Sequence, residues 1–164
     1  MSSQINRFKA FFISFVMVVL TALVGNLFTS RNTETWYLTI NRPSFLPPNY
    51  AFPIAWTILF ILMIISFYLV LTSKINHLKS TNLIKTGIIL FTLQLIFNAL
   101  WCYLFFEAHL LLLSVIEIIV LEILIILTIT TFYKINKTSA YLLIPYALWV
   151  LFATALTIGV YVLN

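Results

Sequence analysis

Charged residues divide this chain into five long apolar stretches. Between Lys9 and Arg31, for example, no charged residue occurs. A helix needs roughly 20 predominantly apolar residues to cross the hydrocarbon core of a bilayer, and each stretch reaches that length. The pattern therefore predicts five transmembrane helices, at about residues 9–29, 51–74, 84–106, 109–133 and 139–162.

The composition excludes a domain that folds in water. Of the 164 residues, 63% are hydrophobic and 8% are charged, whereas soluble domains carry roughly a quarter charged residues. No stretch is polar enough and long enough to form a second, soluble unit. We therefore predict an all-α membrane protein that forms a single domain over residues 1–164, built as a bundle of five transmembrane helices.

Several kinds of chemistry lack the residues they need. The single cysteine, Cys102, excludes an intrachain disulfide and a thiolate metal cluster. His77 and His109 fall at opposite ends of the predicted bundle, so we expect no metal site. No glycine-rich phosphate loop is present, and we expect no resident cofactor. The net charge of +5 comes from cations at the ends of apolar stretches, which argues against a nucleic-acid partner.

The loop cations predict how the chain crosses the membrane. Arg31 and Arg42 fall on one side of the predicted bundle. Cytoplasmic loops carry an excess of Lys and Arg, so the side with more cations should face the cytoplasm. This places the N-terminus inside and the proline-rich loop outside. The more basic side holds seven cations: Arg7, Lys9, Lys74, Lys79, Lys85, Lys134 and Lys137.

The connection between the first two helices, residues 30–50, is rich in proline and aromatic residues. With the start of the second helix it reads WYLTINRPSFLPPNYAFPIAW over residues 36–56 and holds four of the five prolines. Proline fixes φ and lacks an N–H group, so residues 41–48 should be extended or turned. Two interpretations remain open. The aromatic residues form either a belt at the headgroup level, which composition favours, or a lid over a cavity.

Helical spacing places aromatic and amide side chains on common faces. Residues three or four positions apart lie on one side of a helix, so three faces of this kind arise. If they converge, they form an aromatic cavity suited to a flat, mostly apolar ligand. Ordinary packing, with the amides as hydrogen bonds between helices, explains the same spacing. The faces are Phe52, Trp56 and Phe60; Gln94, Asn98 and Trp101; and Trp149 with Ala153.

Two acids interrupt the fourth apolar stretch, Glu117 and Glu122. Charged groups at membrane depth are costly and usually face the bundle interior. Five residues rotate these side chains about 140° apart, which argues against a paired-carboxylate site. We expect Glu122, near the middle of its helix, to be protonated or hydrogen-bonded. Glu122 either forms a structural hydrogen bond to a neighbouring helix or takes part in ligand binding or proton transfer.

Three motifs in order resemble those of the TspO/MBR family, the translocator proteins once called peripheral benzodiazepine receptors. The first is the segment over residues 36–56. The second is QLIFNALW, residues 94–101, and the third is LIPYALWVLFAT, residues 143–154. The resemblance covers about residues 10–164. It implies a five-helix fold, a homodimer embedded in membrane lipid, and a pocket that opens toward the loop between the first two helices.

The family binds tetrapyrroles such as porphyrin and haem, and benzodiazepine-type ligands. The resemblance therefore implies a porphyrin or haem-type ligand for this chain, in a sensing, transport or scavenging role. Two alternatives stay open: light- and oxygen-dependent porphyrin degradation with Trp56 and Trp149 as catalytic residues, and proton-coupled export through Glu122. The implied ligand-binding residues are Tyr37, Pro47, Phe52, Trp56, Phe60, Asn98, Trp101, Glu117, Trp149 and Ala153.

The chain departs from the family in the fourth and fifth helices. Glu117 stands where the family often has Asp, and Glu122 has no counterpart that the resemblance identifies. The cholesterol-recognition pattern of animal members needs a basic residue after a Tyr near the C-terminus, but Tyr161 is followed only by Val, Leu and Asn. With the charge bias of the loops, this favours the cytoplasmic membrane of a bacterium.

Overall fold

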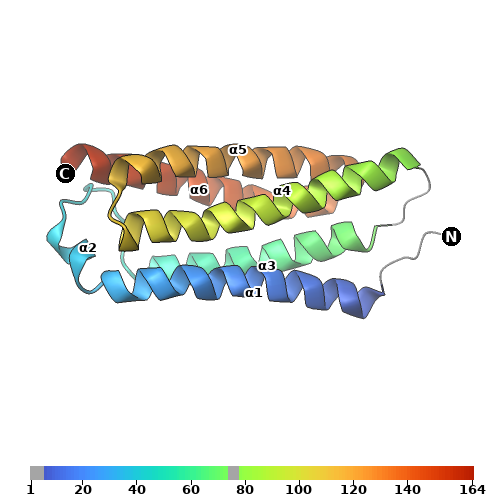
Figure 1. Cartoon of the computed structure of the whole chain (residues 1–164), viewed down its shortest axis with the longest axis horizontal. Coiled ribbons are helices and arrows are strands. Elements are labelled where there is room, and N and C mark those ends of the chain that lie inside the picture. Colours follow the sequence, from blue (N-terminus) through green and yellow to red (C-terminus); the bar gives the residue numbers. More distant parts are fainter. Residues whose placement is uncertain (1–5, 74–77) are drawn as a thin grey trace.

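Five long helices form an elongated bundle in the computed structural model (Figure 1). The structure describes residues 6–73 and 78–164, and the side chains of the second range from residue 81 onward. All five helices are long and apolar enough to cross a membrane, which confirms the predicted fold class. They are α1 (Arg7–Asn32), α3 (Ala51–Leu71), α4 (Leu78–Cys102), α5 (Leu111–Ile135) and α6 (Lys137–Leu163).

Long helices that follow one another in the chain run antiparallel, and α5 lies between α4 and α6. On the other side, α3 packs against α6, while α1 packs against both α3 and α4. The start of α1 lies at one end of the bundle, and the C-terminus lies at the opposite end beside the α1–α3 loop (Figure 1). We call the end that carries this loop the outer end and the other the inner end. The loop and the last turn of α6 are therefore neighbours in space.

Aromatic stacking and a pair of serines hold the inner half together. The ring of Phe91 stacks on Phe67 at 4.3 Å and on Phe132 at 5.8 Å between centroids, which joins α3, α4 and α5. The hydroxyl groups of Ser66 and Ser139 each lie 2.8 Å from the backbone carbonyl of the other residue, which joins α3 to α6. All five residues are buried. In contrast, all five long helices expose large apolar side chains on their outer faces, as expected for contact with lipid.

The helix ends differ from the expected positions where polar sequence continues a helix. α4 begins at Leu78, before the expected start near residue 84. Hydropathy marks only the part of a helix that lies in the bilayer, so it misses a polar first turn. A short helix, α2 (Trp36–Thr39), lies within the predicted loop. A π-helical turn (Tyr103–Glu107) extends α4, and His109 then reverses the chain with φ of 55°, a left-handed conformation in which histidine is enriched.

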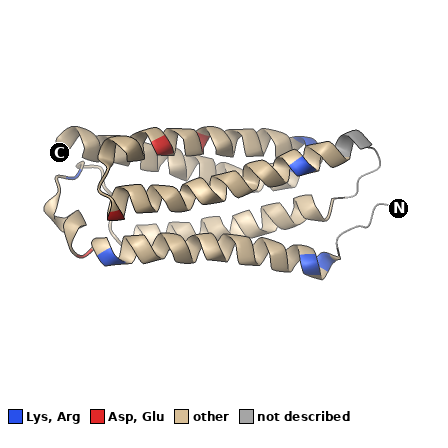
Figure 2. Cartoon of the chain, in the orientation of Figure 1, with Lys and Arg blue, Asp and Glu red and all other residues tan. Residues whose placement is uncertain are grey.

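The Lys and Arg residues lie toward the two ends of the bundle, whereas the acids Glu117 and Glu122 lie within α5 (Figure 2). Among the described cations, Arg31 at the end of α1 and Arg42 in the loop lie at the outer end. The predicted cations Lys74 and Lys79 and the predicted inner-end His77 lie outside the described residues or side chains. Those described at the inner end are Arg7, Lys9, Lys85, Lys134 and Lys137.

Candidate ligand-binding site

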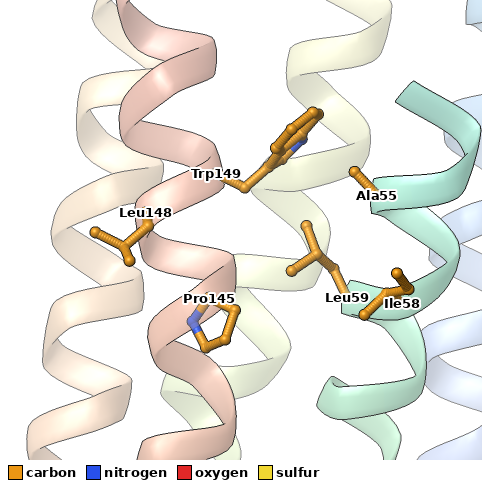
Figure 3. A pocket seen from close by; sticks show the side chains of 6 residues that line it. All are labelled: Ala55, Ile58, Leu59, Pro145, Leu148 and Trp149. Carbon is orange, nitrogen blue, oxygen red and sulfur yellow. The ribbon is translucent and has the colours of Figure 1, made fainter. Parts of the chain in front are cut away.

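An apolar groove of about 390 Å³ lies between α3 and α6 (Figure 3). This volume is within the range of roughly 300–1,000 Å³ that is typical of small-molecule sites. The indole of Trp149 extends from α6 toward the space between the two helices (Figure 3). The lining consists of Ala55, Ile58 and Leu59 from α3 and Pro145, Leu148 and Trp149 from α6.

The local sequence explains why the two helices leave space here. Ala55 contributes only a methyl group to the α3 wall of the groove. On the α6 side, Pro145 lies inside the helix and has no N–H group to donate to the carbonyl of Tyr141, one turn before it. Leu148 and Ile58 are more than half exposed, so the groove is open toward the lipid. An apolar ligand could therefore reach Trp149 from the bilayer.

Behind the groove, aromatic rings connect α3 and α6. The ring of Phe52 meets Trp149 edge to face at 5.9 Å, and one turn along α3 the indole of Trp56 stacks on Phe60 at 5.3 Å. Trp56 also meets the ring of Tyr146 edge to face at 6.2 Å. Such pairs add about 0.5–1.5 kcal/mol beyond their burial. Trp149 and Trp56 thus belong to two groups of rings, Phe52–Trp149 and Phe60–Trp56–Tyr146, that each join α3 to α6. We call these two groups together the aromatic network.

A second aromatic cluster closes the outer end of the bundle. The indole of Trp101 stacks on Phe105 at 5.1 Å, and Trp36 of α2 meets the same Phe105 edge to face at 5.8 Å. Trp36 also stacks on the imidazole of His109 at 4.0 Å. Tyr37 lies against Phe105 and Phe106. Since Trp101 packs against both this cluster and the main core, it links the loop to the aromatic network.

Several buried polar atoms near the aromatic network have no hydrogen-bond partner within the described part of the chain. They include both amide atoms of Gln94, the indole nitrogen of Trp101 and both carboxyl oxygens of Glu117. Gln94 is fully buried and Glu117 is 5% exposed. Leaving such a group unsatisfied costs about 1–3 kcal/mol, more where it is charged. The interior therefore offers donors and acceptors that a polar atom of a ligand, or water, could satisfy.

The structure divides the predicted site residues into two groups. The α3–α6 group is connected through Tyr146, whose hydroxyl accepts a hydrogen bond from the Asn98 amide at 3.1 Å. Tyr37 and Trp101 belong to the outer cluster instead, and Pro47 lies half-buried in the loop. Glu117 is buried on the inner face of α5, while Glu122 is half-buried. The α3–α6 group consists of Phe52, Trp56, Phe60, Trp149 and Ala153 on α3 and α6, and Asn98 of α4 joins it through Tyr146.

Sequence reasoning missed some residues that shape the site. Tyr146 lies three positions before Trp149, so its place on the same face of α6 could have been read from helical spacing. Phe105 and Phe106 gave no such signal, because the π-helical turn that directs them inward cannot be read from periodicity. Ala55 and Pro145 matter for the space they leave, which depends on the facing helix.

The loop residue Tyr37 has an altered acidity. Burial raises the pKa of Tyr37 above its usual value, and the positive charge of Arg42 acts in the opposite direction with a smaller effect. The guanidinium carbon of Arg42 lies 5.6 Å from the centre of the Tyr37 ring. The neutral phenol is therefore the favoured form while the loop is packed against the bundle.

Comparisons with known proteins agree on one family. The sequence model described as the TspO/MBR family matches residues 12–163. The chain is 38% identical to the tryptophan-rich protein TspO of Archaeoglobus fulgidus, over 92% of this chain and 94% of that protein. It is 31% identical to protein CrtK of Rhodobacter capsulatus, over 94% and 92% of the two chains. It is 27% identical to the human translocator protein, over 84% and 79%.

Proposed function

Because the chain belongs to the TspO/MBR family of multi-pass membrane proteins, we propose that it binds a porphyrin or haem-type tetrapyrrole at the groove beside Trp149. In this role it senses, transports or scavenges the ligand. The loop over residues 40–50 covers the outer end of the site.

The groove between α3 and α6 carries this proposal. Its walls are apolar, and the indole of Trp149 provides a flat aromatic face of the kind that stacks on a macrocycle. A groove of about 390 Å³ that is open to lipid can hold part of a large planar ring while the rest remains in the bilayer.

Binding can be tested by the quenching of tryptophan fluorescence with protoporphyrin IX, in lipid nanodiscs kept in the dark. We expect saturable quenching for the unmodified protein. Trp149→Phe should weaken binding about fivefold to tenfold, since stacking contributes about 1 kcal/mol and 1.4 kcal/mol corresponds to tenfold. Trp36→Phe is the matched control, because Trp36 lies in the outer cluster against His109 and Phe105. Quenching that never saturates would mean that the porphyrin only partitions into lipid, which would refute the proposal.

One observation supports a second candidate function, light- and oxygen-dependent breakdown of the bound porphyrin. Trp149 lines the groove, and Trp56 belongs to α3, the other helix that borders it. Indole is electron-rich, so either ring could reduce a light-excited macrocycle beside it. The same samples, illuminated in air, test this. Loss of porphyrin absorbance that requires Trp56 or Trp149 supports degradation, and absorbance that stays constant while binding saturates favours binding alone.

We also propose a membrane setting and an assembly. The described inner-end cations outnumber Arg31 and Arg42, which supports a bacterial cytoplasmic membrane with the N-terminus inside. The family resemblance suggests a homodimer. The orientation can be tested with the variants Phe8→Cys and Tyr50→Cys, each made in a Cys102→Ala background. Each variant is treated with a thiol reagent that cannot cross the membrane. Labelling of residue 8 from the periplasmic side would contradict this orientation.

A further inference from the structure

The loop between α2 and α3 is fastened to the last turn of α6 by a reciprocal pair of asparagines. The backbone N–H of Asn41 donates to the side-chain oxygen of Asn164 at 2.9 Å, and the Asn164 amide donates to the Asn41 carbonyl at 2.9 Å. The side chain of Asn41 also donates to the carbonyl of Leu163 at 3.1 Å. A second bond from the Asn164 amide to the Val160 carbonyl, at 2.8 Å, holds this side chain in place on its own helix.

Beside this clasp, the loop lies directly on a glycine of α6. A Cβ atom at Gly159 would lie 3.1 Å and 3.2 Å from the Cγ and Cβ atoms of Pro43. A side chain at residue 159 would therefore require the proline ring to shift by a few tenths of an ångström. Pro43 is buried, whereas Asn41 and Asn164 are both exposed. The contact thus combines a buried apolar part, Pro43 on Gly159, with exposed hydrogen bonds between Asn41 and Asn164 for which water competes.

The fastened loop connects to the proposed ligand groove through a row of aromatic rings. Phe45 of the loop meets Phe152 of α6 edge to face at 6.5 Å. Phe152 in turn lies 5.8 Å from Trp149, which forms a wall of the groove. Lifting the loop would remove Phe45 from this row and free the outer side of Phe152. Access to Trp149 from the outer end therefore depends on whether the loop is seated.

We propose that Asn41 and Asn164 form a latch that holds the loop on its Gly159 seat, and that opening of this latch sets the rate at which a ligand exchanges with the groove through its outer end. This inference rests on the proposed function for the identity of the ligand, but the latch itself does not. Exposed hydrogen bonds contribute little net stability, so the seated and lifted loop differ by a small free energy. Such a balance lets the loop open often without unfolding the bundle.

Hydrogen exchange at the backbone amide of Asn41 reports the latch without any ligand, because this N–H donates to Asn164. In nanodiscs, Asn164→Ala should speed exchange at Asn41 about fivefold or more. Asn164→Asp should give a smaller increase, since it keeps the acceptor and loses the donor. Val162→Ala is the matched control, because Val162 lies in the same turn and is 73% exposed.

Ligand exchange is then followed by stopped-flow fluorescence with protoporphyrin IX. Asn164→Ala should raise the association and dissociation rates together, by about fivefold, and leave the Kd within twofold. Gly159→Ala should act in the same direction by unseating Pro43. Gly25→Ala controls for the added methyl group, since its Cβ would meet only the flexible side chain of Cys102, at 3.2 Å from the Sγ atom.

Each outcome decides the inference. Unchanged exchange at Asn41 in Asn164→Ala would overturn the latch. Faster exchange at Asn41 with wild-type porphyrin rates would overturn its control of ligand access, and so would a weaker Kd caused by dissociation alone, which indicates a direct contact. If no variant and no wild-type sample binds porphyrin, the proposed function fails while exchange at Asn41 still decides whether the latch exists.

Discussion

The side-chain amide of Asn98 donates a hydrogen bond to the hydroxyl of Tyr146 over 3.1 Å, deep between α4 and α6. Tyr146 is fully buried, and Asn98 is 5% exposed. The bond holds the tyrosine ring against Trp56, so a polar contact fixes one side of the aromatic network. It also fixes the position of α4 along the axis of α6.

Removing this hydroxyl should destabilise the protein. Tyr146→Phe leaves a buried amide donor without a partner, so we expect a loss of about 1–2 kcal/mol in the free energy of unfolding. Thermal unfolding in a mild detergent measures it. The double variant Tyr146→Phe with Asn98→Leu should recover part of the loss, because both polar partners are then absent. Tyr161→Phe, at a 41% exposed position, is the control. An equal effect of Tyr146→Phe and this control would contradict the role of the bond.

The serine pair at the inner end predicts that removing one of two buried hydroxyl groups, Ser66 or Ser14, costs more stability than removing the other. Ser66→Ala removes bonds between α3 and α6, and should cost about 0.6–1.7 kcal/mol, from the average to the maximum measured for hydrogen bonds between membrane helices. Ser14→Ala is a matched control, since Ser14 is also fully buried but bonds only to Ala10 of its own helix. Unfolding in detergent compares the two. A larger effect at Ser14 would show that the α3–α6 bonds add no stability.

Filling the groove should block the ligand without disturbing the core. Ala55→Leu adds bulk to the α3 wall, so we expect binding of protoporphyrin IX to weaken at least tenfold in the quenching titration. Because the new side chain enters open space, thermal stability should change little. Ala155→Leu places the same side chain at an exposed position on α6 outside the lining and should bind normally. Normal binding by Ala55→Leu would place the ligand elsewhere.

The raised pKa of Tyr37 predicts that the stability of the folded protein depends on pH in the alkaline range. Burial raises its pKa in the folded protein, so folding favours the protonated phenol. The resulting stabilisation is complete below the unfolded pKa of about 10 and is lost as the pH rises from there through the folded value. Absorbance titration of wild type minus Tyr37→Phe measures this pKa. Arg42→Gln should raise it further, because the opposing charge is removed, while Arg31→Gln should not. A lower pKa in Arg42→Gln would contradict the assignment.

Much of the architecture could be predicted from the sequence, since each of its features is local. Uninterrupted apolar stretches identify the five membrane helices, because the bilayer requires that length of each helix separately. The prolines between Asn41 and Pro48 likewise exclude a helix there, since proline acts on its own residue and the one before it. The three motifs also point to the family that the comparisons show.

The site depends on relations between helices that no local pattern contains. Spacing places Phe52, Trp56 and Phe60 on one face of α3, but which α6 residues lie opposite depends on how the two helices are staggered. The same holds for the groove, which exists because Ala55 and Pro145 line the same gap. Trp101 has suitable spacing on α4, yet the π-helical turn after it brings Phe105 against its indole, which makes Trp101 part of the outer cluster.

Sequence alone determined which segments enter the membrane, because burial in lipid is decided helix by helix from apolar length. It also determined the stiff, aromatic character of the loop, because proline and ring side chains carry those properties themselves. Only the tertiary structure decided that Asn41 meets Asn164 and that Pro43 lies on Gly159, contacts between residues more than a hundred positions apart. Packing of five helices around one core brings these segments together, and the composition of the chain does not specify that packing.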